Sequence, residues 1–273
     1  MGTQAPYVLD NDEPTASPML DHLSAILDGF TIERLTEAGV PAGGRCWEVG
    51  AGNGSISSWL GEQVGAGGTV IATDIKPQHV RHHARVRIVT HDVAGQPPPD
   101  LGFGLMHARL VLAHLPTRRQ VVKTLAEALA PGGALVIEEW GQWSGMVLSS
   151  PVPDAAAIYG RYTAALLEVF RSFGNDPTWA AQVPQAMADA GLVEVDTVCH
   201  ADSWRGGSAG CLLPVVVSTE LRGHLIGAGA RAEDLDALPE IMHHPDTLVL
   251  GNLTFSTIGR RPSAADRPTA ELS

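Results

Sequence analysis

A run of alternating glycines is the feature of this chain most suited to holding a ligand. Residues 46–55 read CWEVGAGNGS, with an acid at Glu48 and glycines at positions 50, 52 and 54. Backbone without Cβ atoms can turn sharply and lie directly against a flat ligand. A helix that begins after such a turn points its unpaired N–H groups at the same ligand. We therefore predict a ligand-binding turn between a strand and a helix.

A second acid narrows the class of ligand. Residues 70–75 read VIATDI, an apolar strand that ends at Asp74, 24 residues after Gly50. In open α/β sheets a carboxylate at this place accepts hydrogen bonds from the hydroxyl groups of a ribose. Together with the glycine turn, Asp74 predicts a ligand that contains adenosine.

The glycine spacing and the neighbouring charge distinguish two such ligands. A dinucleotide site requires Gly-x-Gly-x-x-Gly or Gly-x-Gly-x-x-Ala. Here the last position is Ser55, and the third glycine falls one residue early at Gly54. Glu48 would repel a pyrophosphate, whereas it would attract an ammonium or a sulfonium group. The charges therefore favour S-adenosylmethionine over NAD.

In this order and at these distances, the motifs resemble those of class I S-adenosylmethionine-dependent methyltransferases. The resemblance covers roughly residues 19–140, with a continuation to about residue 260. The matching segments are the glycine motif Glu48–Gly54, Asp74, Asp92 in VTHDV, HARLVLAHLP at 107–116 and APGGALVIEE at 130–139. The resemblance implies a transferase with a Rossmann-like fold and S-adenosylmethionine as its cofactor.

The resemblance also implies where the cofactor lies. The glycine turn would approach the methionine and the ribose, Asp74 would hold the ribose, and Asp92 would lie along the adenine. The expected cofactor contacts are Tyr7, Glu48, Gly50, Ala51, Gly52, Asp74, Ile75, Asp92, Val93, Ala108 and Arg109. Three of these residues have a structural alternative. Asp92 could cap a helix, Arg109 could form an ion pair, and Tyr7 could lie in a disordered arm.

Two side chains are candidates for a general base. Methyl transfer from a sulfonium is an in-line displacement, so the protein mainly aligns the reacting atoms and excludes water. His114 follows the fourth expected strand and titrates in a useful range. Glu138 and Glu139 end the fifth strand, where alternation lets one of them face the pocket, and we choose Glu139. A packing role for His114 and solvated glutamates are the alternative. The histidine and cysteine spacings match no metal motif, so we expect no metal.

The composition of the chain limits the classes of molecule that it is expected to bind. The 273 residues include 30 acids and 18 bases, for a net charge of −12. Such a balance disfavours nucleic acids and anionic membranes, so we expect a small-molecule acceptor. Three cysteines without paired spacing favour reduced thiols and a cytoplasmic protein. A composition rich in Ala, Gly, Arg and Pro is typical of a GC-rich genome and suggests bacterial secondary metabolism. A homodimer is left open.

Alternating strand and helix patterns predict the architecture. Strands separated by helices pair in parallel through right-handed crossovers. We predict an α/β, Rossmann-like, mostly parallel seven-stranded sheet, with helices on both faces and a helical cap over the carboxyl edge. The first helix is expected to break at Asp28-Gly29. The expected strands are at about 45–49, 69–73, 86–90, 102–107, 134–139, 192–200 and 248–258.

Three segments are expected along the chain. A flexible N-terminal arm covers residues 1–16, a methyltransferase domain covers 17–261, and a disordered tail covers 262–273. Insertions at about 141–190 and 201–245 would form the cap over the active site. The candidates for the wall of the acceptor pocket are Trp140, Trp143, Met146, Tyr159 and Tyr162.

The sequence thus predicts an S-adenosylmethionine-dependent methyltransferase that acts on an oxygen, nitrogen or carbon atom of a small molecule. Two other functions stay open at this point. The same fold can use a bound cofactor without consuming it, for a cyclisation or a rearrangement. An NAD-dependent oxidoreductase is the second, against which Ser55 and Glu48 argue. The sequence leaves the acceptor atom, the general base and the oligomeric state undetermined.

Overall fold

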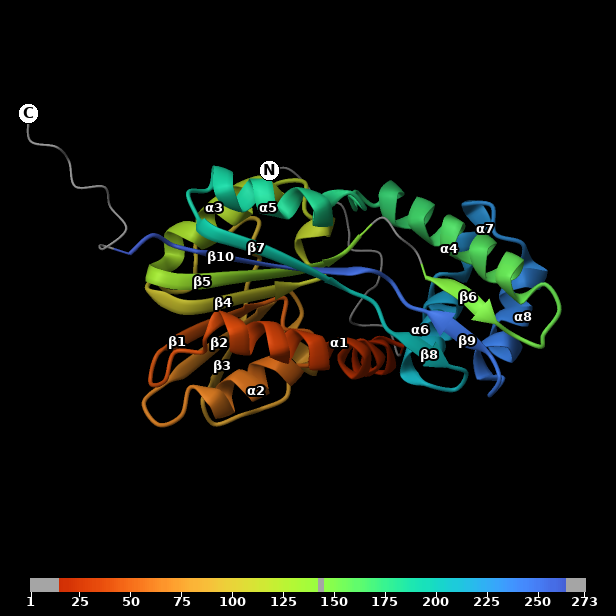
Figure 1. The fold of residues 1–273 in the computed structure, drawn as a ribbon, viewed down its shortest axis with the longest axis horizontal. Helices are drawn as coiled ribbons and strands as arrows, with labels where there is room; N and C mark the ends of the chain where they lie inside the picture. Colours follow the sequence, from red (N-terminus) through yellow and green to blue (C-terminus); the bar gives the residue numbers. More distant parts are fainter. Residues whose placement is uncertain (1–14, 142–144, 264–273) are drawn as a thin grey trace, which may run out of the picture.

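A seven-stranded sheet forms the centre of the molecule (Figure 1). The computed structural model describes residues 15–141 and 145–263. In spatial order the strands are β3 (Val86–Thr90), β2 (Thr69–Asp74), β1 (Arg45–Val49), β4 (Phe103–Arg109), β5 (Leu129–Trp140), β10 (Thr254–Arg260) and β7 (Val193–His200). Neighbours pair in parallel except at β10, which is antiparallel to β5 and β7. The predicted mostly parallel, Rossmann-like sheet is confirmed.

Helices cover both faces of this sheet, as its apolar strands require. On one face lie α1 (Ala16–Ala38) and α2 (Ser55–Gln63), and on the other lie α3 (Arg118–Ala128) and α5 (Trp179–Asp189). Successive residues of β1 alternate between two cores. Cys46 packs in the core under α1 and α2, and Trp47 packs in the core under α3 and α5. Parallel strands are stable only with such burial on both faces.

A second layer lies beyond the carboxyl ends of the parallel strands and forms a cap (Figure 1). Its elements are α4 (Ala155–Ser172), α6 (Ala209–Glu220), α7 (Arg222–Gly227), α8 (Ala232–His243) and a small antiparallel sheet of β6 (Met146–Ser149), β9 (Leu248–Leu250) and β8 (Ser203–Arg205). The cap has a core of its own, which includes Tyr159 and Tyr162. Helix α1 joins the two parts, because Met19 packs in the cap core and Leu35 packs in the sheet core. None of the helices in the described ranges is long and apolar enough to cross a membrane.

Three details differ from the expectations. Helix α1 continues through Gly29, because packing at both of its ends outweighs the intrinsic cost of about 1 kcal/mol for a helical glycine. The expected last strand is two strands, β9 and β10, because the chain changes sheets near Gly251. A Cβ atom there would lie 2.4 Å from the ring of Trp204. Helix α5, expected in the cap, instead packs on the sheet through Trp179 and Met187.

Candidate active site

A cavity of about 580 Å³ lies between the strand ends and the cap. Open α/β sheets bind ligands at this edge, where the strand order reverses. The sheet half of the cavity is lined from the strand ends, by Glu48–Asn53, Asp74, Asp92, Val93 and Arg109. The cap half is lined from α4 and α6, by Tyr159, Tyr162, Leu166, Phe170, Leu213 and Val217. His114, Glu139 and Trp140 belong to the same lining, at the ends of β5 and of the short helix η2 (Leu112–His114).

The sheet half is built around the glycine turn after β1. Gly50, Gly52 and Gly54 have φ angles of 68°, 57° and 76°, a backbone region that other residues rarely adopt. A Cβ atom on Gly50 would lie 2.3 Å from Cγ2 of Val111, so glycine is required for this close approach. Helix α2 begins at Ser55, directly after the turn. The predicted glycine turn between a strand and a helix is confirmed.

Asp74 ends β2 and faces the glycine turn. Its Oδ2 accepts the N–H of Gly52 at 3.1 Å, and its Oδ1 accepts the N–H of Lys76 at 3.0 Å. Burial raises the pKa of Asp74, although these backbone donors act in the opposite direction. The backbone N–H of Ile75 also lowers this pKa, so three backbone donors leave about one of the four lone-pair positions of the carboxylate for a sugar hydroxyl. The position therefore suits a ribose.

Asp92 lies in the turn after β3 and lines the cavity together with Val93. Its Oδ1 accepts the N–H of Ala94 at 2.9 Å, and its own N–H donates to Oε1 of Gln96 at 2.9 Å. No α-helix follows within the described residues 92–102, so Asp92 does not cap a helix. Its side chain stabilises a turn instead. The turn fixes Asp92 at the edge of the cavity.

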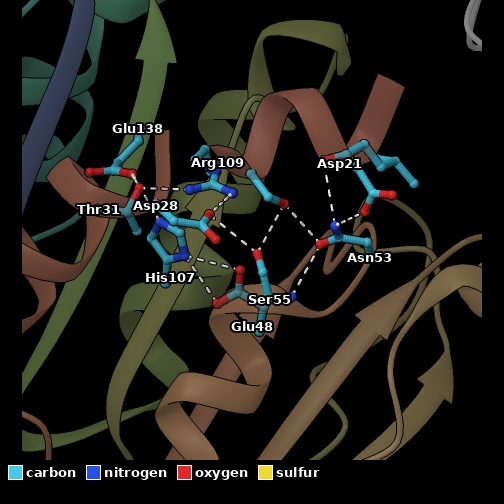
Figure 2. A network of polar contacts seen from close by, with 11 residues as sticks. Asp21, Asp28, Thr31, Glu48, Asn53, Ser55, His107, Arg109 and Glu138 are labelled. Atoms are coloured by element: carbon cyan, nitrogen blue, oxygen red, sulfur yellow. Dashed lines mark hydrogen bonds and ion pairs between the residues drawn. The ribbon is translucent and has the colours of Figure 1, made fainter. Parts of the chain in front are cut away.

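A buried group of polar side chains lies between the sheet and α1 (Figure 2). The Nδ1 of His107 lies 3.0 Å from both carboxylate oxygens of Glu48, and its Nε2 lies 3.3 Å from Oε2 of Glu138. Because carboxylates only accept, both ring nitrogens donate and the ring is an imidazolium. Burial lowers the pKa of His107, but the two glutamates outweigh burial and raise it to about 9. Burial by itself would raise the pKa of Glu138, but its hydrogen bond and ion pair with His107 outweigh burial, so the pKa of Glu138 is lowered.

Two side chains of α1 connect this group to the glycine turn (Figure 2). Thr31 donates to Glu138 and accepts from Nη1 of Arg109 at 2.8 Å. The Nη2 of Arg109 donates to Asp28 at 2.9 Å, and Asp28 also accepts from the hydroxyl of Ser55 at 3.2 Å. Arg109 thus forms the ion pair that was its structural alternative, while it also lines the cavity. We call this set the polar layer, and its members are Asp28, Thr31, Glu48, His107, Arg109 and Glu138.

The cap half contrasts with the polar layer, because aromatic and aliphatic side chains form its walls. Tyr159 and Tyr162 pack against each other with ring centroids 5.9 Å apart. Among the residues that the structure describes, neither Lys nor Arg lines this half. The described wall of the cap half therefore offers no Lys or Arg side chain to an anionic group.

Glu139 lies between the two halves, at the end of β5. It lines the cavity, whereas Glu138 points to the opposite face of the sheet and joins the polar layer. The Oε1 of Glu139 accepts the N–H groups of Leu112 at 2.8 Å and Ala113 at 3.1 Å. Burial raises the pKa of Glu139 to about 8 against the effect of these donors. Such a value is close to that of an effective general base at neutral pH.

His114 ends η2 at the same junction. Its ring stands edge-on to Phe170 with centroids 6.1 Å apart, and its Nδ1 lies 3.2 Å from the amide nitrogen of Asn175. An amide nitrogen only donates, so Nδ1 accepts and the neutral ring carries its proton on Nε2. Burial, followed by the charge of Arg118, lowers the pKa of His114 to about 4. The ring is therefore neutral at physiological pH.

Comparisons with known proteins identify the family. The family described as methyltransferase domain matches residues 25–158. The chain belongs to the class I S-adenosylmethionine-dependent methyltransferases. Methyltransferase str2 of Strobilurus tenacellus is 29% identical over 198 residues, which are 70% of this methyltransferase and 69% of the relative. The C-methyltransferase UbiE of Pseudomonas putida is named for ubiquinone and menaquinone biosynthesis. It is 26% identical over 131 residues, which are 44% of this chain and 50% of the length of UbiE.

A solved structure supports the same fold. Phosphoethanolamine N-methyltransferase 2 of Haemonchus contortus, in complex with S-adenosylhomocysteine, superposes with a TM-score of 0.54 at 14% identity. The superposition covers 86% of this methyltransferase and 53% of the other chain. At this identity the likeness concerns the fold alone.

S-adenosylmethionine is the cofactor of this methyltransferase, and the sheet half of the cavity fits it. The glycine turn presents backbone, Asp74 lines the cavity at the end of β2, and Glu48 places a carboxylate before the turn. The alternative of an NAD-dependent oxidoreductase is wrong, in line with the repulsion that Glu48 would exert on a pyrophosphate.

The cavity brings together most residues expected to bind the cofactor. Those that line it are Glu48, Gly50, Ala51, Gly52, Asp74, Ile75, Asp92, Val93 and Arg109. Ala108 does not line it, because alternation along β4 turns its side chain into the core under α3 and α5. Tyr7 and Trp143 lie outside the described residues. Met146, expected in the acceptor wall, lies on β6 and is 41% exposed, while the other three described wall residues line the cavity.

Two groups of lining residues had no recognisable signal in the sequence. Leu110 follows β4 with a φ of 56°, a left-handed conformation that is strained for leucine. Its N–H donates to the carbonyl of Glu138 at 2.8 Å. Met19, Leu20 and Leu23 reach the cavity from α1. Their apolar spacing predicts a helix face but does not reveal which surface that face covers.

The cysteines are unpaired, and the His, Cys, Asp and Glu side chains of the described residues form no metal site. Cys46 and Cys211 are buried, Cys199 is exposed, and all three are free thiols. Burial, together with the charge of Glu48, raises the pKa of Cys46 to about 12. Within residues 15–141 and 145–263, no cluster of three His, Cys, Asp or Glu side chains is arranged to hold a metal ion.

Proposed function

We propose that this methyltransferase moves a methyl group to a small, uncharged and largely apolar acceptor that occupies the cap half. One observation carries the proposal: the cap half is continuous with the sheet half, yet no Lys or Arg lines it among the described residues. A carboxylate or phosphate on the acceptor would lose its hydration there without gaining a counter-ion. An aromatic or aliphatic acceptor would instead gain the burial of its apolar surface.

In this proposal the two halves have separate tasks. Bound S-adenosylmethionine supplies a methyl group that is already electrophilic. Asp74 holds the ribose, Asp92 and Val93 lie along the adenine, and the glycine turn with Glu48 contacts the methionine end. The cap excludes water and aligns the acceptor, and alignment is the main requirement of an in-line transfer.

Glu139 is the proposed general base. Its carboxylate accepts the proton that the acceptor loses as the methyl group is transferred. The raised pKa makes this carboxylate a stronger base than an exposed glutamate. His114 is the proposed orienting group. With Nδ1 accepting from Asn175 and the proton on Nε2, the neutral ring has no lone pair available for base catalysis.

A set of matched acceptors tests the proposal. Each pair contains the same aromatic nucleophile with a methyl ester in one compound and the free carboxylic acid in the other. We expect S-adenosylhomocysteine and a methylated product from the ester only. Equal kcat/KM values for ester and acid would contradict an uncharged acceptor. Product formed without S-adenosylhomocysteine would indicate a cyclisation or rearrangement instead of methyl transfer.

NMR of the product would show whether oxygen, nitrogen or carbon receives the methyl group. The relative from Pseudomonas putida is named as a C-methyltransferase, which keeps carbon among the three. A role in secondary metabolism, a cytoplasmic location and a homodimer stay predictions from the sequence. Light scattering of the purified chain tests the last of these.

A further inference from the structure

The charges in the polar layer do not balance. Three carboxylates, on Glu48, Glu138 and Asp28, face two cations, the imidazolium of His107 and the guanidinium of Arg109. The side chains of His107 and Glu138 are fully buried, and that of Asp28 is 25% exposed. One excess negative charge therefore remains in a region largely removed from water.

The excess charge lies against the cavity. Glu48 and Arg109 line the sheet half, and Asp28 reaches the first residue of α2 at the other end of the glycine turn. Glu139 does not add a full charge at neutral pH, because burial raises its pKa to about 8. Asp21, farther along α1, forms an ion pair with Arg81 at 2.9 Å. The layer is thus a local source of negative potential beside the turn.

We propose that the polar layer makes the site selective for S-adenosylmethionine over its demethylated product, S-adenosylhomocysteine, because its one excess negative charge attracts the sulfonium. The inference rests on the proposed placement of the methionine end beside Glu48. The two ligands share their other groups and differ by the methyl group and one positive charge. After transfer, S-adenosylhomocysteine has no positive charge for the layer to attract. It is therefore held less tightly and is exchanged more easily for S-adenosylmethionine.

The expected size of the effect follows from the burial. With an effective dielectric constant of about 20, removal of a unit charge at a separation of about 10–15 Å, the order of one side chain beyond the cavity wall, would change an affinity about five- to fifteenfold. With the dielectric constant of bulk water, about 80, the same charge at the same separation would change the affinity about twofold or less. The charge of the layer affects the affinity for the cofactor strongly because the layer is buried.

Calorimetric titration of the full chain with each ligand tests the inference. Glu138→Gln removes one negative charge from a residue that does not line the cavity and keeps its shape. At about pH 6, where His107 stays protonated with a single carboxylate partner, we expect the Kd for S-adenosylmethionine to rise about five- to fifteenfold more than the Kd for S-adenosylhomocysteine. Thr31→Val is the matched control, because it removes the contacts to Glu138 and Arg109 without a change of charge. We expect it to change both Kd values by the same factor.

A second charge variant makes the test independent of whether Glu138→Gln folds. Asp28→Asn neutralises the more exposed end of the layer, so its shift in the ratio of Kd values should have the same sign and a smaller size. Equal shifts for both ligands in either folded charge variant would overturn the charge selection. A failure of the proposed cofactor placement would appear differently, as an Asp74→Ala variant that binds both ligands as well as the wild-type chain.

Discussion

The two halves of the cavity are held together by different interactions. In the sheet half, each important side chain has named polar partners, as Asp74 has in two backbone N–H groups and His107 in two carboxylates. In the cap half, packing of rings such as Tyr159 and Tyr162 forms the wall. Hydrogen bonds tolerate small deviations only, whereas apolar packing tolerates exchange of similar volumes. The first half therefore suits one fixed cofactor, and the second suits an acceptor that can differ among related enzymes.

Helix α1 belongs to both halves and couples them. Its first turns place Met19 in the cap core, and its middle places Asp28 and Thr31 in the polar layer. A change in the polar layer therefore reaches the cap through one rigid helix. The comparison predicts that variants of one half leave the other half's ligand unaffected unless they act through α1 or at the junction.

The largest effect is expected at the junction of the two halves. Glu139→Gln should lower kcat about 10²–10⁴-fold, the usual contribution of a general base, and leave the affinity for S-adenosylhomocysteine unchanged. Because the carboxylate is the active form, the wild-type kcat/KM should rise with pH up to about 8 and then level off. The variant should lose this rise. Glu127→Gln, on the exposed face of α3, is the control and should keep full activity. A Glu139→Gln enzyme with normal kcat would place the base elsewhere.

A large effect confined to the sheet half is expected from Asp74→Ala. Loss of a charge-assisted hydrogen bond should weaken the binding of both S-adenosylmethionine and S-adenosylhomocysteine by about 1.5–3 kcal/mol. The KM for the acceptor should not change at saturating cofactor. Calorimetry measures the first effect and steady-state kinetics the second. Asp100→Ala removes an exposed carboxylate that pairs with Arg45 at 3.0 Å and serves as the control. Unchanged cofactor affinity would remove Asp74 from the site.

The polar layer should also make stability depend on pH. The pKa of His107 is raised from 6.5 to about 9 in the folded chain, so its contribution is complete below pH 6.5 and lost as the pH rises through 9. We expect the free energy of unfolding to fall by on the order of 2 kcal/mol across this window. Urea titrations at several pH values measure it, and NMR of the imidazole gives the pKa directly. An imidazole that titrates near 6.5 would contradict the imidazolium bridge.

The smallest effect is expected in the cap half. Phe170→Ala removes one ring of the wall and should raise the KM for an apolar acceptor about tenfold, as loss of an aromatic contact and its buried area predicts. The affinity for S-adenosylhomocysteine should stay the same. Leu101→Ala is the control, because Leu101 is an exposed apolar residue outside both α1 and the cavity. A change in cofactor affinity with unchanged acceptor KM would reverse the assignment of the two halves.

Several parts of the site were predictable because their signals are local. The glycine turn is one, since positive φ angles favour glycine at positions that the sequence displays directly. Asp74 is another, because an acid that ends an apolar strand lies at a known edge of the sheet. Alternation also limited the pocket to one of Glu138 and Glu139. Alternation also turns the side chain of Ala108 into the core, so only its backbone stays a predicted cofactor contact, while its neighbour Arg109 takes the side that faces the cavity.

Other parts required the folded chain. The sequence separates Glu48 from His107 by 59 residues, and pairing of β1 with β4 makes them neighbours. Nothing in the local pattern around His107 indicates an imidazolium. The neutral state of His114 and the raised pKa of Glu139 likewise come from burial under the cap.

By itself, the order of residues determined the alternation of strands and helices, the glycine turn and the acid that closes β2. These features depend on periodicity and on backbone freedom, which short stretches of sequence express. Only the tertiary structure decided which charges meet, which side chains lose water and where the cap closes. Those properties arise from contacts between distant segments, and the energy of a charge depends on the groups and the solvent around it.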